Sequence, residues 1–270
     1  MEECGYGVAA GHAIADTRPI TRAEPSDTDI EGIVATCTDY AASWLEGDPD
    51  RMAACLHPGL AKRAVVDPAS GSLELDESSF AEMVASAARG SRTFARDLHI
   101  QVHDVSAGMA SASVLSEPWL DLVHLAWFGD RWRIVNVLYE QRPPAVDAAE
   151  DRAAIADVLD VYAALGFDDD ASAVLATHHP ALAERRTIVA DSGDLELEDS
   201  TRDEVVGIVR QGLEFKRFER TWDARVLEVG HDVAAGKVVA GWYDVDLHLG
   251  RFGGQWMIVN ILYRVLPYEP

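Results

Sequence analysis

The residues that could carry chemistry are polar side chains in otherwise apolar stretches. Tyr40 shares the expected inner face of a helix with Trp44, and Asp121 interrupts an apolar strand that begins at Trp119. A buried phenol or carboxyl needs hydrogen-bond partners, and apolar surroundings raise the pKa of a carboxyl. His57 stands before a proline, where it could act as a general base of ordinary pKa or bond to the backbone at a helix end.

Two asparagines also interrupt apolar strands. Simple strand alternation places Asn136 on one face with Trp132 and Leu138, and Tyr139 on the other face. Asn260 occupies the same place near the end of the chain. A buried amide must find partners, so each asparagine either ties neighbouring strands together or faces a ligand.

The elements that must position these residues occur twice. The segment 132–139 (WRIVNVLY) returns at 256–263 (WMIVNILY) with six of eight residues identical. Tyr162 lies 122 positions after Tyr40, and His179 lies 122 positions after His57. A match kept over so many positions indicates a tandem duplication.

Helical periodicity begins near Ser26, and a second helix begins near Asp48. A strand is expected over about 60–67, a short one near 73–75, then a third helix, then strands near 94–105, 109–117, 119–128 and 131–140. Three helices followed by a strand meander predict an α+β fold with a bent antiparallel sheet. We expect a tail over 1–25, domains over 26–141 and 147–270, and a linker over 142–146.

Composition excludes several function classes. The chain has 270 residues, with 23 basic and 46 acidic side chains and a formal net charge of −23, which disfavours nucleic acids and anionic membranes. No apolar run is long enough to span a bilayer, and no secretory signal is recognised. Three cysteines without metal-type spacing fit a reducing, cytoplasmic location. His99 and His103 lack a third ligand at a regular spacing, so we expect no metal and no cofactor.

The chain resembles the nuclear transport factor 2-like superfamily, which includes ketosteroid isomerases and SnoaL-like polyketide cyclases, and within it the lumazine-binding group. The residues that carry the resemblance over about 26–140 and 147–264 are Tyr40, Trp44-x-x-Gly-Asp48, Leu56-His-Pro-x-Leu60, Lys62-Arg63, Asp121 and Trp132-x-Ile-Val-Asn136. It implies two cone-shaped, cystatin-like α+β barrels, each able to enclose a small apolar ligand. It also implies that the sheets of the two copies pair as an intramolecular pseudo-dimer within a monomer or homodimer.

The resemblance implies roles for single residues. Tyr40 and a protonated Asp121 occupy the places of the two oxyanion-hole donors of ketosteroid isomerase, which stabilise a developing enolate. The isomerase's base matches a position near Ala64, so His57 or Asp67 would have to substitute. The expected pocket-lining residues are Trp44, Arg63, Trp119 and Asn136 in the first copy and Tyr162, Tyr243 and Asn260 in the second.

Three functions remain open from the sequence. The first is a small-molecule-binding protein, with or without cofactor-independent isomerase, cyclase or dehydratase activity in the N-terminal pocket. The second is a non-catalytic binding or assembly module with filled cones. The third is an epoxide hydrolase, which would need Arg63 to face Asp67 or Asp121 around a water.

Overall fold

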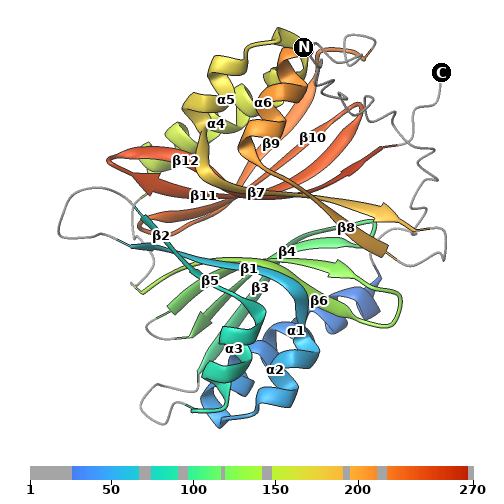
Figure 1. Ribbon diagram of the computed structural model, residues 1–270, viewed down its shortest axis with the longest axis vertical. Helices are drawn as coiled ribbons and strands as arrows, with labels where there is room; N and C mark the ends of the chain where they lie inside the picture. The colour runs from blue at the N-terminus through green and yellow to red at the C-terminus, as the bar shows by residue number, and fades with distance from the viewer. Residues whose placement is uncertain are drawn as a thin grey trace, which may run out of the picture.

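The computed structural model describes residues 26–66, 74–90, 97–116, 119–141, 148–190, 195–211 and 218–266. The predicted tail (1–25) and linker (142–146), and the suggested base Asp67, lie outside these ranges. The described part forms two similar units of helices and one sheet each (Figure 1). This confirms the predicted α+β fold with a tandem repeat.

The first unit contains α1 (Asp27–Glu46), α2 (Pro49–Cys55), β1 (Leu56–Val66), β2 (Glu74–Ser78), α3 (Phe80–Ala87), β3 (Leu98–Ser106), β4 (Met109–Ser116), β5 (Trp119–Trp127) and β6 (Trp132–Glu140). The second unit contains α4 (Ala149–Asp168), α5 (Ala171–Thr177), β7 (His178–Val189), β8 (Leu195–Ser200), α6 (Arg202–Arg210), β9 (Trp222–Val229), β10 (Val233–Ala240), β11 (Tyr243–Phe252) and β12 (Gln255–Val265). The second unit thus repeats the element order of the first.

Local signals in the sequence set the bounds of α1, the helix that carries Tyr40. Ser26 and Asp29 form a reciprocal capping box that satisfies backbone donors of its first turn. Gly47 ends the helix in the left-handed conformation, with φ of 79°. Ile33, Cys37 and Tyr40 recur on the buried face.

The two sheets share one topology, with strand orders β2-β1-β6-β5-β4-β3 and β8-β7-β12-β11-β10-β9. Within each, β1 with β6 and β7 with β12 are parallel pairs, and the other pairs are antiparallel. Both sheets are therefore mixed. The parallel pairs form where the strands that follow α2 and α5, namely β1 and β7, lie beside the last strands, β6 and β12.

Each sheet has helices on one face and the other sheet on its opposite face, so the sheets meet in the middle of the molecule (Figure 1). Apolar residues fill this contact: Leu122 and Leu138 of the first unit cluster with Val233 and Phe252 of the second. Burial of such surface stabilises the contact by roughly 25 cal/mol per Å².

A β-bulge overturns the simple alternation expected along 132–139. His124 pairs with Asn136 whereas the next residue, Leu125, pairs with Ile134, so Val135 is an extra residue on β6. Asn136 therefore falls on the opposite face from Ile134, towards the second unit. The repeat has the same register shift, because His248 pairs with Asn260 and Leu249 with Ile258.

Candidate functional site

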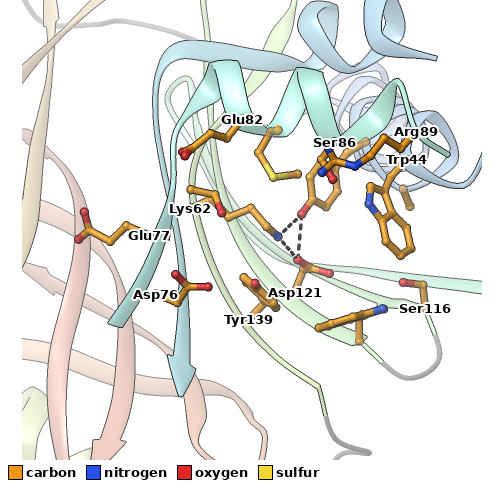
Figure 2. A pocket seen from close by; sticks show the side chains of 15 residues that line it. Trp44, Lys62, Asp76, Glu77, Glu82, Ser86, Arg89, Ser116, Asp121 and Tyr139 are labelled. Atoms are coloured by element: carbon orange, nitrogen blue, oxygen red, sulfur yellow. Dashed lines mark hydrogen bonds and ion pairs between the residues drawn. The ribbon is translucent and has the colours of Figure 1, made fainter. Parts of the chain in front are cut away.

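A cavity of about 490 Å³ opens in the first unit, bounded by α1, α3, β2 and the helix-facing side of the sheet (Figure 2). Aromatic rings form one wall. Trp44 and Trp119 meet edge to face with centroids 6.4 Å apart, and Trp119 lies 5.6 Å from Tyr139. The rim is polar, and its residues are Asp76, Glu77, Ser78, Glu82, Ser86, Arg89 and Ser116.

Three buried polar side chains meet at the inner end of the cavity. The Lys62 ammonium donates to the Tyr40 hydroxyl oxygen at 2.6 Å and to Asp121 Oδ1 at 2.9 Å, and the Tyr40 hydroxyl donates to the same Oδ1 at 2.9 Å. The exposed fractions are 5% for Tyr40, 8% for Lys62 and 6% for Asp121. We call these three residues the inner cluster.

Three different elements bring the inner cluster together. Tyr40 comes from the inner face of α1, Lys62 from β1 and Asp121 from β5. β6 lies between β1 and β5, and its Tyr139 pairs with Asp121 on one side and with Ala64 on the other. The Lys62 ammonium consequently lies 3.8 Å from the centroid of the Tyr139 ring, a distance suited to a cation–π contact.

The surroundings keep both phenols protonated. Burial, and then the Asp121 charge, hold the pKa of Tyr40 well above its usual value. Burial also raises the pKa of Tyr139, and the nearby Asp121 and Asp76 charges add to the effect. At neutral pH each of these tyrosines is therefore a neutral group able to donate one hydrogen bond.

This geometry differs from the oxyanion hole implied by the resemblance. Tyr40 and Asp121 do lie together, but Asp121 Oδ1 accepts hydrogen bonds from Tyr40 and from the Lys62 ammonium. Through Oδ1, Asp121 is therefore an acceptor paired with a cation, whereas the resemblance implies a hydrogen-bond donor at this position. Lys62 was not predicted as the partner of Asp121. Strand alternation could have indicated it, because Lys62 lies on the same face of β1 as Leu60 and Ala64, which are both buried.

Arg63, Asn136 and Asn260 do not line the cavity, contrary to their expected role. Arg63 crosses to the second unit and donates to the carbonyl of Val259 at 3.0 Å and to Asn260 Oδ1 at 2.9 Å. Asn136 donates to the Ile261 carbonyl at 3.4 Å across the same contact. The two β-bulges explain this placement, because they turn both asparagines from the helices towards the other sheet.

His57 also lies away from the inner cluster. Its ring stacks on Phe128 with centroids 4.6 Å apart, and its Nδ1 accepts a hydrogen bond from the Gly59 backbone at 3.1 Å. Burial, together with the charges of Arg185 and Arg133, lowers its pKa to about 4. Of the two roles expected for His57, the structure shows the hydrogen bond to the backbone. His57 does not line the cavity, so it is not placed to take a proton from a molecule bound there.

A second pair of histidines at equivalent positions of the repeat, His124 and His248, joins the two units. The rings of His124 and His248 stack with centroids 3.5 Å apart, and both side chains are fully buried. Each Nδ1 faces the side-chain amide of an asparagine, Asn136 at 3.2 Å and Asn260 at 3.3 Å. Burial lowers the pKa of both histidines, that of His248 to about 3, so both are neutral.

The interior of the second unit has a different set of polar groups. Tyr162 and Tyr243, both expected to line a pocket, contact each other edge to face at 6.1 Å. Glu184 lies where the first unit has Lys62, and burial raises its pKa to about 7 although Tyr263 donates a hydrogen bond to it. Gly166 replaces Trp44, and the pair of opposite charges found in the first unit has no counterpart at these positions.

No group of three or more His, Cys, Asp or Glu side chains in the described ranges is arranged to hold a metal ion. None of the helices in these ranges is long and apolar enough to cross a membrane.

Among comparisons with known proteins, one family model matches the first unit, over less than half of the chain. A protein-family model described as "Putative lumazine-binding" matches residues 28–140. No curated protein matches the chain. Among solved structures, a nuclear transport factor 2-like protein from Silicibacter pomeroyi DSS-3 is 16% identical over 44% of this chain and 100% of its own, with a TM-score of 0.38.

Two further solved structures also align with less than half of the chain. A nuclear transport factor 2-like protein from Methylobacillus flagellatus KT is 19% identical over 46% of this chain and 98% of its own, with a TM-score of 0.37. A protein from Novosphingobium aromaticivorans DSM 12444, titled "Putative Scytalone Dehydratase", is 12% identical over 43% of this chain and 85% of its own, with a TM-score of 0.33. The chain is a tandem pair of α+β units with one sheet topology, and the family model described as "Putative lumazine-binding" matches the first of them.

Proposed function

We propose that the first unit binds a flat, oxygenated small molecule in its cavity. The observation that carries this proposal is the inner cluster, a buried ion pair joined to a phenol at the closed end of a cavity of about 490 Å³. Small-molecule sites usually have volumes of about 300–1,000 Å³, with apolar walls and a few placed polar groups. The wall of Trp44, Trp119 and Tyr139 provides apolar surface for a ring system.

Energetics supports a binding role for the inner cluster. Burying an ion pair is seldom more stabilising than filling the same space with apolar side chains, because both charges lose hydration. The second unit has the same fold without a pair at these positions, since Glu184 and Val245 stand where the first unit has Lys62 and Asp121. Its own buried ion pairs, of Lys237 with Asp244 and Asp246, lie elsewhere, on β10 and β11. The fold therefore does not require the pair, which favours a role towards a ligand.

Acid–base catalysis of an isomerisation, cyclisation or dehydration is the second candidate. One observation favours it: Asp121 holds a neutral phenol through Oδ1, and no donor among the described residues hydrogen-bonds to its Oδ2. Oδ2 could accept a proton from a bound molecule while Tyr40 moves its hydrogen bond to the substrate oxygen. This would supply the base missing from the sequence, without a cofactor.

The two other functions have less support. Epoxide hydrolysis needs a cationic arginine at the reacting water, and Arg63 instead bonds to the second unit. A sealed assembly module needs filled cones, whereas the first cone has open space. A cytoplasmic location and the absence of nucleic-acid partners remain predictions from the sequence.

The test uses lumazine, a flat pteridinedione, as the probe, because of the family match. Titration should quench the fluorescence of the wall tryptophans. Tyr40→Phe should weaken binding by about tenfold, because the variant loses the hydroxyl that holds the Asp121 carboxylate in position at the inner end of the cavity. Tyr162→Phe is the matched control in the second unit and should leave the affinity unchanged. Native mass spectrometry of the purified chain would detect a retained natural ligand.

Two outcomes would contradict the proposal. One is that neither lumazine nor any co-purified molecule binds. The other is that Tyr40→Phe and Tyr162→Phe have equal effects on binding, which would place the molecule outside the cavity of the first unit.

A further inference from the structure

The inner cluster offers a ligand few hydrogen-bond donors. The Lys62 ammonium has three protons: two are directed to Tyr40 and Asp121, and the ring face of Tyr139 lies 3.8 Å from its nitrogen. The Tyr40 proton is directed to Asp121 Oδ1. In this arrangement, each donor of the cluster already has an internal acceptor, and the cation is offset by the carboxylate beside it.

The same cluster leaves one strong acceptor open. Both hydrogen bonds of Asp121 go to Oδ1, and within the described part of the chain no donor hydrogen-bonds to Oδ2. Only 6% of Asp121 is exposed. Figure 2 shows its carboxylate facing the cavity between Tyr139 and Ser116. Oδ2 is open to the cavity and not enclosed, so a ligand donor that reached it would form a charge-assisted hydrogen bond.

A second acceptor lies on the other side of Tyr139. Asp76 on β2 is an exposed residue at the rim of the cavity, and within the described residues its carboxylate has no hydrogen bond or ion pair. The charges of Asp76 and Asp121 both raise the pKa of Tyr139, which agrees with their positions on either side of its ring. A ligand in the cavity therefore meets negative potential from two directions.

The rest of the lining does not reverse this balance. The Glu77 carboxylate is paired with Arg63 at 3.1 Å, and Glu82 accepts bonds from Ser79 in the capping box of α3. Arg89 is exposed at the rim, and Figure 2 places it beside Trp44, away from Asp76. With Lys62 offset by Asp121, the inner part of the cavity is acceptor-rich.

We propose that this cavity selects flat ring ligands that carry an ammonium or N–H donor at their inner end, and that it discriminates against carboxylates and other anions. The inference rests on the proposed function and specifies its ligand class. The donor would bind Asp121 Oδ2, and the ring would lie against Trp44 and Trp119. It reverses the polarity implied by an oxyanion hole, which would bind an anion.

The experiment compares four ligands with one ring system on the full-length chain by isothermal titration calorimetry. They are 2-naphthylmethylammonium, neutral 2-naphthol, naphthalene-2-carboxylate and the neutral 2-methylnaphthalene. The expected order of affinity is ammonium, naphthol, methylnaphthalene and carboxylate, with about tenfold or more between the two charged ligands. Physiological ionic strength screens the overall charge of the protein, because the Debye length is then about 8 Å.

Three variants locate the effect. Asp121→Asn and Asp76→Asn should each reduce the preference for the ammonium over the carboxylate. Asp157→Asn removes the same charge from an exposed site on α4 and should leave the preference unchanged. Circular dichroism checks that each variant is folded, and Asp76→Asn keeps the test decisive if Asp121→Asn does not fold.

The outcomes separate the two proposals. If the neutral ring binds but the carboxylate binds as tightly as the ammonium, the donor selectivity is refuted and the cavity remains a ligand site. If Asp157→Asn reduces the preference as much as Asp76→Asn, the selectivity comes from the overall charge and the inference fails. If none of the four ligands and no lumazine binds, both proposals fail.

Discussion

Replacing Lys62 by methionine should strongly destabilise the first unit. Methionine keeps most of the side-chain length but removes the charge, and it leaves the Asp121 carboxylate 6% exposed with only the Tyr40 hydrogen bond. Breaking a buried ion pair by removing one partner costs about 3–5 kcal/mol. Because Oδ2 faces a cavity that can admit water, we expect the lower end of this range, about 3 kcal/mol.

The double variant Lys62→Met/Asp121→Leu gives the sharpest form of this prediction. It removes both charges, so no unpaired ion remains and the cost should fall to about 1 kcal/mol or less. Urea unfolding followed by far-UV circular dichroism measures all members of the cycle. Arg131→Met, which removes the arginine of the exposed Arg131–Asp130 pair, is the control and should leave the midpoint unchanged.

The result that would refute this reasoning is additivity. If the double variant loses as much stability as the two single variants together, the charges do not depend on each other and the ion pair is not the central contact. A Lys62→Met loss no larger than that of Arg131→Met would show that the inner cluster is hydrated like the protein surface.

Three other predictions concern pH and the contact between the units. Burial lowers the pKa of His248 from its ordinary value of 6.5 to about 3, so its contribution to stability is complete above pH 6.5. Stability should fall as the pH drops from 6.5 towards 3, by up to about 1.4 kcal/mol per pH unit, and His248→Phe should flatten this slope in acid unfolding curves. Burial raises the pKa of Glu184 from 4.5 to about 7, so stability is lost as the pH rises from 4.5 through 7. Glu184→Gln should recover up to about 3 kcal/mol at alkaline pH and little at acid pH. Thermal unfolding of the variant at an acid and an alkaline pH measures this difference. Arg63→Ala removes two hydrogen bonds between the units and should lower the free energy of unfolding by about 2–4 kcal/mol. In calorimetry, the single unfolding transition should then divide into two, one for each unit. A single transition at the unchanged temperature would contradict this prediction.

The order and type of the elements could be predicted because local and repeated signals specify them. The strand expected at 109–117 is β4, Met109–Ser116, and the strand expected at 131–140 is β6, Trp132–Glu140. Period-2 alternation and turn residues depend only on neighbours in the chain. The duplication provided the same signals a second time, which strengthened each assignment.

The partners of the site residues could not be predicted in the same way. The β-bulge at Val135 depends on how β6 pairs with β5, and this single extra residue moved Asn136 from the expected ligand face to the contact between the units. The Lys62–Asp121 pair joins residues 59 positions apart, and nothing local to either residue specifies it. The alternation of β1 places Lys62 on the buried face of the strand. A lysine is rarely buried without a partner, however, so the sequence alone favours an exposed position for it.

The duplication also explains which residues stayed alike between the units. In a contact with two-fold character each interaction occurs twice, with the roles of the two copies exchanged, so a change in one copy must fit the unchanged other copy. His124 stacks on its own copy His248, whereas Asn136 donates to the Ile261 carbonyl and Asn260 donates to the carbonyl of Val137, the residue that matches Ile261. The interior of each cone meets no copy of itself, so Lys62 in one unit and Glu184 in the other are free to differ. The shared contact thus accounts for the identical histidines and asparagines, and the separate interiors account for the different residues at the positions of Lys62 and Glu184.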